Sequence, residues 1–414
     1  MNRLITSSSN HLISIAFCLL LSAFCFSSLF AQADWRYDRT GVYSNETGLL
    51  KSWPAKGPEL LWHYDGLGDG HSSVSAASEK LYVTGLIEEK GYLFVFDKTG
   101  KLLNKIMYGD EWKDSYPGPR ASPVINSGKI YLMGVLGNLI CLDEKNLNVI
   151  WERNILAEFD AKSESGLNES PLIIGDMIIA TPGGKEHNVI ALNKNTGKLI
   201  WTSTAMGEIA AYCSPLYIGD QKIPLIVTQT HEHIIGLEAS TGKLMWSVEH
   251  KNKNAIHPNT PLYENGMILC TSVDPGSKML RLLDGGRKVE IAWENPLLDN
   301  MMGGMVKLGN YCYFSAGNPK NKFWYCVNWE TGEIMYKEDG LVNSGVTISA
   351  DNMLYCYSEK GDMALVRPNP EKFDMVSKFK ITLGTDQHWA HPSIYQGVLY
   401  VRHGDALMAY KIKD

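Results

Sequence analysis

The sequence lacks any surplus of basic residues. It contains 39 Lys and Arg against 45 Asp and Glu, which gives a formal net charge of −6. Nucleic-acid binding depends on clustered Lys and Arg, so this composition argues against a nucleic-acid partner. Hydrophobic residues make up 44% of the chain and charged residues 20%, a balance that excludes a disordered or fibrous protein.

The chain also lacks a Cys-x-x-Cys pair, which argues against a zinc ribbon and against covalently attached haem. Two of its eight cysteines lie in the first 33 residues, and the other six are Cys141, Cys213, Cys270, Cys312, Cys326 and Cys356. An even number in an exported protein permits disulfides. Most of the six, however, lie in strand-like runs such as NYCYF and WYCVN. We therefore expect buried free thiols that pack as small apolar side chains.

Long apolar runs are absent except at the N-terminus. Residues 12–30 are almost entirely apolar, and Ala31-Gln32-Ala33 follows as an A-x-A cleavage signal. We interpret residues 1–33 as a secretory signal peptide, which places the mature protein in the periplasm or outside the cell. The alternative is a membrane anchor, but serines interrupt the run and no basic cluster follows it. No later stretch reaches the ~18 apolar residues of a spanning helix, so we expect no transmembrane segment in the mature chain.

Glycine is abundant, with 38 residues, and a turn followed by an aromatic residue recurs along the chain. Residues 193–201 read NKNTGKLIW, 238–246 read EASTGKLMW, and 328–336 read NWETGEIMY. A second repeat lies upstream of each turn. It begins with Ser-Pro or a close variant and continues into an alternating apolar run, as in SPVINSGKIYLMG at 122–134. Counting degenerate copies, the sequence contains eight units.

Each unit of about 45 residues contains four short strand patterns. In the third unit these are residues 171–174, 177–182, 187–193 and 198–204, with a glycine turn at 195–197. Four strands repeated eight times predict an all-β fold, an eight-bladed β-propeller of four-stranded antiparallel blades. A β-sandwich or a solenoid is the alternative.

The last unit ends near residue 411 without a fourth strand, whereas residues 60–64 near the start form a strand pattern with no partners. We predict that this N-terminal strand completes the last blade and closes the ring. The predicted domains are a signal peptide at 1–33, an N-terminal extension at 34–58, and the propeller at 59–414. The repeated aromatic residues should pack between neighbouring blades, and they are Trp62, Trp151, Trp201, Trp246, Trp293 and Tyr336.

The repeat at 191–201 and 236–246, of the form A-x-D-x-x-T-G-x-x-x-W, resembles the tryptophan-docking repeat of the pyrroloquinoline-quinone (PQQ) propellers. That superfamily includes eight-bladed quinoprotein alcohol dehydrogenases and the non-catalytic propeller of outer-membrane barrel assembly. The opening segment 34–62 resembles secreted, dehydrogenase-like PQQ repeat proteins, whose Trp-Pro-x-Trp-Arg-Gly-Pro start is partly kept from Trp35-Arg36 to Gly41. The resemblance covers about 34–411 and implies the propeller fold.

For activity the resemblance implies less. The quinoprotein dehydrogenases carry two adjacent cysteines over the quinone, and this sequence has no Cys-Cys pair. It also has no haem motif, and no calcium-ligand set can be matched residue by residue. We therefore expect no cofactor, with PQQ and calcium as the disfavoured alternative.

The first strand of each propeller blade lines the central channel, so the residues before it should surround the channel mouth. Aligning the repeats places one such residue in each blade, and these are His71, Arg120, Asn168, Tyr212, Pro258, Met301, Ser344 and Trp389. Glu169, His257, His388 and His391 lie nearby. The candidate ligand-binding set at this rim is His71, Arg120, Asn168, Tyr212, His257, Trp389 and His391. These polar and aromatic side chains suit an oriented polar ligand such as a sugar or an acid. Arg120 could pair with a carboxylate, and Tyr212 or His257 could accept a proton. The alternative is that rim residues only hydrate the channel.

His231 and His233 are weak candidates for metal binding, because residues i and i+2 of a strand share a face. No third ligand is identifiable, and a solvated pair is the preferred interpretation.

The sequence therefore favours an exported, non-catalytic module that binds a small polar or carbohydrate ligand or an envelope protein. The alternative is an enzyme with a site at the axial mouth, either a quinone-dependent oxidoreductase or a carbohydrate-active enzyme. The catalytic residues of such an enzyme are not identifiable from the sequence.

Overall fold

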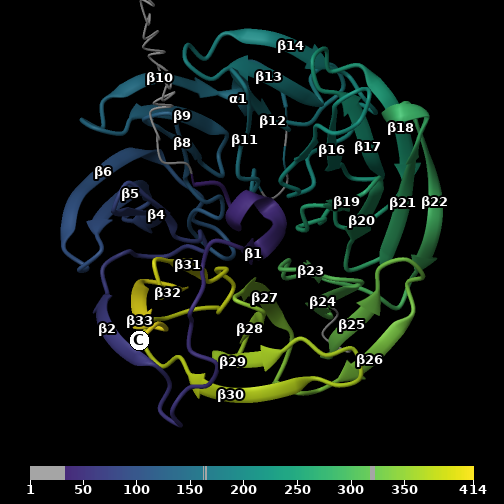
Figure 1. The fold of residues 1–414 in the computed structure, drawn as a ribbon. Coiled ribbons are helices and arrows are strands. Elements are labelled where there is room, and N and C mark those ends of the chain that lie inside the picture. Colours follow the sequence, from purple (N-terminus) through teal and green to yellow (C-terminus); the bar gives the residue numbers. More distant parts are fainter. Residues whose placement is uncertain (1–32, 162, 164–165, 318–321) are drawn as a thin grey trace, which may run out of the picture.

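The computed structural model shows eight β-sheets arranged in a ring, as Figure 1 shows in face view. It describes residues 33–161, 163, 166–317 and 322–414. Most of the proposed signal peptide, residues 1–32, lies outside the described residues. No helix in the described part of the chain has the length and apolar character needed to span a membrane.

The first four blades follow one another along the chain. Blade 1 contains β3 (Ser75–Ala77), β4 (Lys80–Ile87), β5 (Lys90–Asp97) and β6 (Leu102–Asp110). Blade 2 contains β7 (Val124–Asn126), β8 (Lys129–Met133), β9 (Asn138–Asp143) and β10 (Val149–Asn154), and the short helix α1 (Ile155–Glu158) follows it. Blade 3 contains β11 (Leu172–Ile174), β12 (Met177–Ala180), β13 (Val189–Asn193) and β14 (Leu199–Ser203). Blade 4 contains β15 (Leu216–Ile218), β16 (Leu225–Gln229), β17 (His233–Glu238) and β18 (Leu244–Glu249).

The other four blades complete the ring. Blade 5 contains β19 (Leu262–Glu264), β20 (Met267–Thr271), β21 (Ser277–Leu283) and β22 (Lys288–Asn295), with the turn η2 (Asp284–Gly286) before β22. Blade 6 contains β23 (Val306–Leu308), β24 (Tyr311–Ser315), β25 (Trp324–Asn328) and β26 (Ile334–Glu338). Blade 7 contains β27 (Gly345–Ala350), β28 (Met353–Ser358), β29 (Asp362–Arg367) and β30 (Asp374–Lys380), and it gains β1 (Val42–Tyr43) as a fifth strand. Blade 8 contains β31 (Ser393–Tyr395), β32 (Val398–His403), β33 (Ala406–Lys411) and β2 (Glu59–Tyr64).

The ring is closed by strands from both ends of the chain, which confirms the predicted eight-bladed propeller. Strand β2 pairs antiparallel with β33, with Glu59 opposite Lys411 and Tyr64 opposite Leu407. The two strands lie side by side in Figure 1. This pairing supplies the missing fourth strand of the last blade, so that blade does not expose β33 as an edge.

The hydrophobic core lies between the blades. It divides into eight clusters, each of which combines side chains of two neighbouring blades. The six cysteines of the described residues are buried within this structure as free thiols. These thiols therefore pack as small apolar side chains within their strands, as the surrounding strand-like sequence predicted.

The repeated aromatic residues lie at these junctions. Four of the indole N–H groups donate a hydrogen bond to a backbone carbonyl of the following blade, with N···O distances of 2.8–3.2 Å. The pairs are Trp62 to Lys98, Trp151 to Lys194, Trp246 to Gly286 and Trp293 to Trp329. Trp201 lies against Gly242 of the next blade, where a Cβ atom would come within 2.4 Å of the indole. The glycine of the Thr-Gly turn therefore leaves room for the tryptophan of the preceding blade.

Candidate functional site

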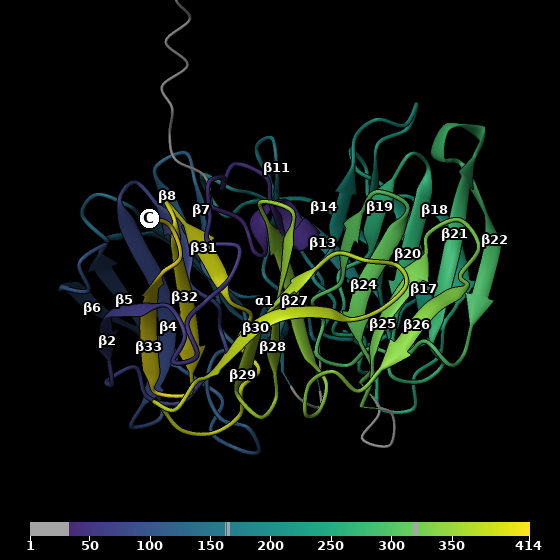
Figure 2. The ribbon, with the colours of Figure 1, turned by 60° about the horizontal axis from the view of Figure 1, so that its bottom comes forward.

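The N-terminal extension enters the central channel. Residues 34–43, called the plug below, form the turn η1 (Tyr37–Gly41) and then β1. Figure 1 shows η1 at the centre of the ring, and Figure 2 shows it inside the ring in side view. Strand β1 pairs parallel with β27, with Val42 opposite Ser349. The plug therefore reaches the far ends of the inner strands, whereas the predicted rim residues precede these strands.

Two buried arginines fix the plug to the ring. Arg36 donates to the carbonyls of Met305 (2.7 Å) and Thr347 (3.2 Å) and to Nδ1 of His391 (2.7 Å), in blades 6, 7 and 8. Gly41 permits this arrangement, because a Cβ atom there would lie 2.1 Å from the Arg36 guanidinium. Burial lowers the pKa of Arg36 to about 10, so the side chain remains charged at neutral pH.

Arg39 makes the corresponding contacts on the other side of the channel. Its guanidinium donates to the carbonyls of Ser170, Pro171 and Pro215, in blades 3 and 4, and it pairs with Asp34 at 2.9 Å. Together the two arginines connect the plug to five of the eight blades. These bonds hold a backbone with positive φ at each residue from Arg36 to Arg39, a conformation that costs roughly 1–2 kcal/mol per residue.

At the other end of the channel the plug forms the base of a cavity of about 320 Å³, called the axial cup below. The residues that line the cup are Trp35, His71, Ser73, Trp112, Ser115, Tyr116, Arg120, Asn168, Ser170, Tyr212, Ser214, Ile256, Pro258, Met301, Met302, Trp389 and His391. Trp35 of the plug belongs to this lining. The cup therefore combines rim residues of several blades with one side chain of the N-terminal segment.

The structure brings six of the seven predicted rim residues into the cup: His71, Arg120, Asn168, Tyr212, Trp389 and His391. The seventh, His257, is fully buried and does not line the cup, although its chain neighbours Ile256 and Pro258 do. Its Nε2 lies 3.2 Å from the carbonyl oxygen of His231.

Arg120 is the cationic group of the cup. Its guanidinium donates to Oδ1 of Asn168 (2.8 Å) and to the carbonyl of Tyr116 (3.1 Å), and it lies 5.8 Å from the indole ring of Trp112. Burial lowers the pKa of Arg120, and the nearby Tyr212 opposes that shift. These contacts fix the direction of the guanidinium fork.

His71 is neutral, because burial lowers its pKa to about 3. Both of its ring nitrogens are inaccessible and have no hydrogen-bond partner among the described residues. Its ring lies 5.1 Å from that of Trp389, which in turn lies 4.7 Å from the ring of Tyr116. A neutral imidazole has one donor and one acceptor, and in this structure neither of these two atoms is accessible from the cup.

His391 serves the plug rather than a ligand in this structure. Its Nδ1 accepts the bond from Arg36, and its Nε2 lies 2.9 Å from the carbonyl of Met302, to which it donates. The two contacts fix the neutral tautomer, and burial holds the pKa of His391 well below its ordinary value.

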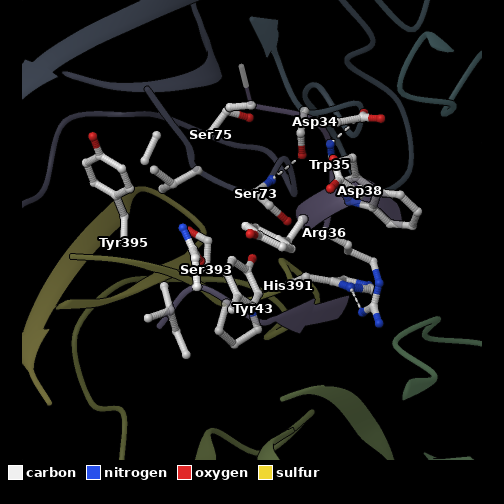
Figure 3. Close-up of a pocket in the computed structure, with 18 residues that line it drawn as sticks. Asp34, Trp35, Arg36, Asp38, Tyr43, Ser73, Ser75, His391, Ser393 and Tyr395 are labelled. Carbon is white, nitrogen blue, oxygen red and sulfur yellow. Dashed lines mark hydrogen bonds between the residues drawn. The ribbon is translucent and has the colours of Figure 1, made fainter. Parts of the chain in front are cut away.

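A second cavity, of about 290 Å³, lies between the plug and blades 1 and 8 (Figure 3). It shares Trp35, Ser73 and His391 with the cup. Figure 3 shows Arg36 beside His391, with the Asp34 and Trp35 side chains above them. Residues of the plug therefore line both cavities.

The two predicted metal candidates, His231 and His233, differ in secondary structure and in hydrogen bonding. His233 begins β17 and its Nδ1 lies 2.5 Å from Oε1 of Glu208, whereas His231 precedes the strand. The shared strand face that the sequence suggested therefore does not extend to His231. Within the described ranges, no group of three or more His, Cys, Asp and Glu side chains is arranged to hold a metal ion.

Glu169 is a buried carboxyl beside the cup residue Asn168. Its Oε1 accepts the backbone N–H of Thr181 at 2.5 Å, and Oε2 has no partner among the described residues. Burial raises its pKa from 4.5 to about 7. The folded protein therefore binds this proton more tightly than the unfolded chain does.

This shift predicts a pH-dependent stability. As the pH rises from about 4.5 to 7, the free energy of unfolding should fall by up to about 3 kcal/mol on account of Glu169 alone. Glu169→Gln should therefore be more stable than the wild type at pH 8 by about that amount and nearly equal to it at pH 4.5. Urea titrations at both pH values test this, with the exposed Glu186→Gln as the control. A pH-independent difference would contradict it.

Sequence reasoning missed the plug and the loop residues Trp112 and Tyr116. The sequence signal for the plug was the Trp-Arg segment at 35–36 followed by Gly41. This local pattern does not indicate that the segment lies in the central channel. Trp112 and Tyr116 lie in the β6–β7 loop, which is outside the repeat.

Comparison with known proteins confirms the resemblance to PQQ-type repeat proteins. Residues 185–304 match the family model described as "Outer membrane protein assembly factor BamB". A quinoprotein ethanol dehydrogenase of Pseudomonas putida is 33% identical over 119 residues, which are 28% of this chain and 18% of that protein. An uncharacterized protein of Rickettsia prowazekii is 26% identical over 272 residues, covering 59% of this chain and 63% of that protein. The matches thus span less than two thirds of each relative.

Solved structures show the same fold at low sequence identity. BamB from Moraxella catarrhalis has a TM-score of 0.53 at 14% identity, covering 80% of this chain and 96% of that one. The quinohemoprotein alcohol dehydrogenase of Comamonas testosteroni has a TM-score of 0.64 at 12% identity, covering 92% and 79%. The chain is an eight-bladed propeller with PQQ-like repeats, and it is similar in part both to an outer membrane protein assembly factor and to quinoprotein ethanol dehydrogenases.

The donor set of the cup does not fit PQQ with calcium. Calcium takes oxygen ligands, typically including carboxylates, and none of the residues that line the cup is Asp or Glu. The adjacent cysteines of the dehydrogenases are also missing from the sequence. The prediction of a protein without this cofactor remains to be tested by reconstitution.

Proposed function

We propose that this protein is an exported, non-catalytic binding propeller whose axial cup holds a small polar ligand. The observation that supports this function is that Arg120, His71 and Trp389 converge on one cavity whose base is formed by the plug. Side chains from several blades line this cavity, together with Trp35 of the plug. A concave, largely pre-formed cavity with a few oriented polar groups is typical of a small-molecule site.

A second candidate function is docking of an envelope protein on the face around the cup. The exposed large apolar residues that lie in loops are Tyr116, Leu136, Met206, Leu297 and Val342. Each lies between the second and third strands of a blade or between consecutive blades, and such loops all share the face that carries the cup. Apolar side chains gathered on one face favour a protein partner there. The matching family model, described as an outer membrane protein assembly factor, agrees with this candidate.

Enzymatic readings of the cup remain open to experiment. A quinone-dependent oxidoreductase would need a retained quinone. A carbohydrate-active enzyme could use Tyr212 beside Arg120 as a proton acceptor, as in elimination chemistry. Either activity would appear as turnover of the bound molecule, whereas a binding module returns its ligand unchanged.

The experiment uses a cup-filling variant. A library of sugars and small acids is screened against the mature protein by thermal shift, and hits are measured by calorimetry and checked for turnover. Met301→Trp should abolish binding of a cup ligand, because the larger side chain fills the cavity. Leu297→Trp, in the same loop but outside the cup lining, is the matched control.

Two results would overturn the proposal. Ligands whose binding survives Met301→Trp would lie outside the cup. The protein can also be incubated with PQQ and calcium and then desalted. Retention of stoichiometric quinone, or dye-linked oxidation of alcohols, would assign the protein as an oxidoreductase instead of a binding module.

A further inference from the structure

We propose that the axial cup binds a monocarboxylated sugar, with the carboxylate on Arg120, hydroxyl groups on His71 and the apolar face of the sugar ring against the aromatic wall. This inference rests on the proposed function and names the chemistry of its ligand. Three independent features of the cup support it: its charge, its unsatisfied polar atoms and its aromatic surface.

The charge of the cup favours an anion. Arg120 is the only Lys or Arg among the lining residues, and no Asp or Glu lines the cavity. His71 and His391 are both neutral at physiological pH, since burial lowers the pKa of each. The cup lining thus carries one positive charge in a partly desolvated setting, with the buried carboxyl of Glu111 close to Arg120 but outside the lining. An Arg guanidinium whose fork is held in direction binds a planar carboxylate more readily than it binds a neutral group.

The polar atoms of His71 favour hydroxyl groups. Its two ring nitrogens are buried and lack partners among the described residues, and one is a donor while the other is an acceptor. A buried polar atom without a partner is costly, so a ligand gains affinity when the His71 ring turns toward the cup and one of these nitrogens pairs with it. A hydroxyl group is both a donor and an acceptor, so it can pair with whichever nitrogen the turned ring presents to the cup.

The aromatic surface favours a ring with an apolar face. The ring centroid of Trp389 lies 5.1 Å from that of His71 and 4.7 Å from that of Tyr116. Trp35 and Trp112 also line the cup. Aromatic faces bury apolar surface while leaving the polar edge of a ligand free to form hydrogen bonds. The volume of about 320 Å³ lies at the lower end of the range of small-molecule sites, roughly 300–1,000 Å³, which suits one or two sugar rings.

The test uses probes that separate these features. Glucuronate carries a carboxylate, hydroxyls and a ring, glucose lacks the carboxylate, and cyclohexanecarboxylate lacks the hydroxyls. Digalacturonate against galacturonate distinguishes the end of an oligosaccharide from a free sugar acid. Binding of each probe to the mature protein is measured by calorimetry, and PQQ is included as a planar acid of different chemistry.

We expect the uronates to bind at least about tenfold more tightly than either truncated probe. Arg120→Gln should reduce uronate affinity to that of the neutral sugar, and Arg120→Lys should restore it only in part. His71→Phe should weaken the uronates and glucose but leave cyclohexanecarboxylate unchanged. Arg281→Gln, at an exposed arginine of β21, is the control. Melting curves identify any variant that fails to fold, and the probe series on the wild type then decides alone.

Equal binding of glucose and glucuronate, or of cyclohexanecarboxylate and glucuronate, would overturn this ligand class. So would binding of PQQ alone, or of none of the probes at millimolar concentration. In each case the proposed function is judged separately, by whether Met301→Trp abolishes the binding of whatever the library screen identifies. Uronate binding that survives Met301→Trp would overturn the cup as its site.

Discussion

Removing residues 34–66 is expected to destabilise the whole ring, more than any single substitution does. The deletion takes away β2, which is hydrogen-bonded to β33, and with it Trp62, whose indole packs against blade 1. Loss of the partly buried Trp62 side chain alone should cost up to about 3 kcal/mol, at the lower end of the range for buried aromatic side chains. The exposed edge of β33 should also promote association between copies.

A shorter deletion separates closure from the plug. Removing residues 34–58 takes away the plug but keeps β2, so the difference between the two deletions reports the closing strand. Thermal melting and sedimentation of both proteins at one concentration provide the measurement. If the two deletion proteins melt together and remain monomeric, β2 contributes nothing to closure.

Replacing Arg36 by Met is expected to cost about 3–5 kcal/mol, the second largest effect. The substitution leaves buried acceptors in three blades, including the carbonyls of Met305 and Thr347, without their donor, and each unsatisfied group costs about 1–3 kcal/mol. It also releases the left-handed turn of the plug, which the arginine bonds hold. Urea titration near pH 7 measures the loss of unfolding free energy.

Arg36→Lys should recover little of this stability, because one ammonium group cannot reproduce a guanidinium fork. Arg281→Met, whose partner Glu290 is also exposed, serves as the control and should change the stability by less than about 1 kcal/mol. A loss below about 1 kcal/mol for Arg36→Met would mean that the plug leaves the channel in solution.

The sequence by itself determined the architecture, because propeller blades are built from local repeats. The third unit illustrates this: the predicted strands at 171–174 and 187–193 correspond to β11 and β13. Alternating apolar residues and glycine turns specify such strands within a few residues of chain. The orphan strand at 60–64 could be paired with the last blade by counting, because only one place in the ring was left.

The rim alignment was predictable for a related reason. Equivalent positions of a cyclic repeat converge on the axis, so aligning the repeats collected Arg120, Asn168 and Tyr212 without any knowledge of contacts. The alignment identifies which residues lie near the axis, but it does not show in which direction their side chains point. His257 adjoins Pro258, the aligned position of its blade, yet its side chain is buried outside the cup lining, and His391 is used by the plug.

Only the tertiary structure decided where the N-terminal segment lies. The bonds of Arg36 and Arg39 reach blades that are 131 to 355 residues away in the chain, and no periodicity connects such positions. The turn itself has left-handed backbone at four consecutive non-glycine residues, which local preference opposes and only the surrounding carbonyls stabilise. The base of the cup is therefore a product of long-range packing, whereas its walls follow from the repeat.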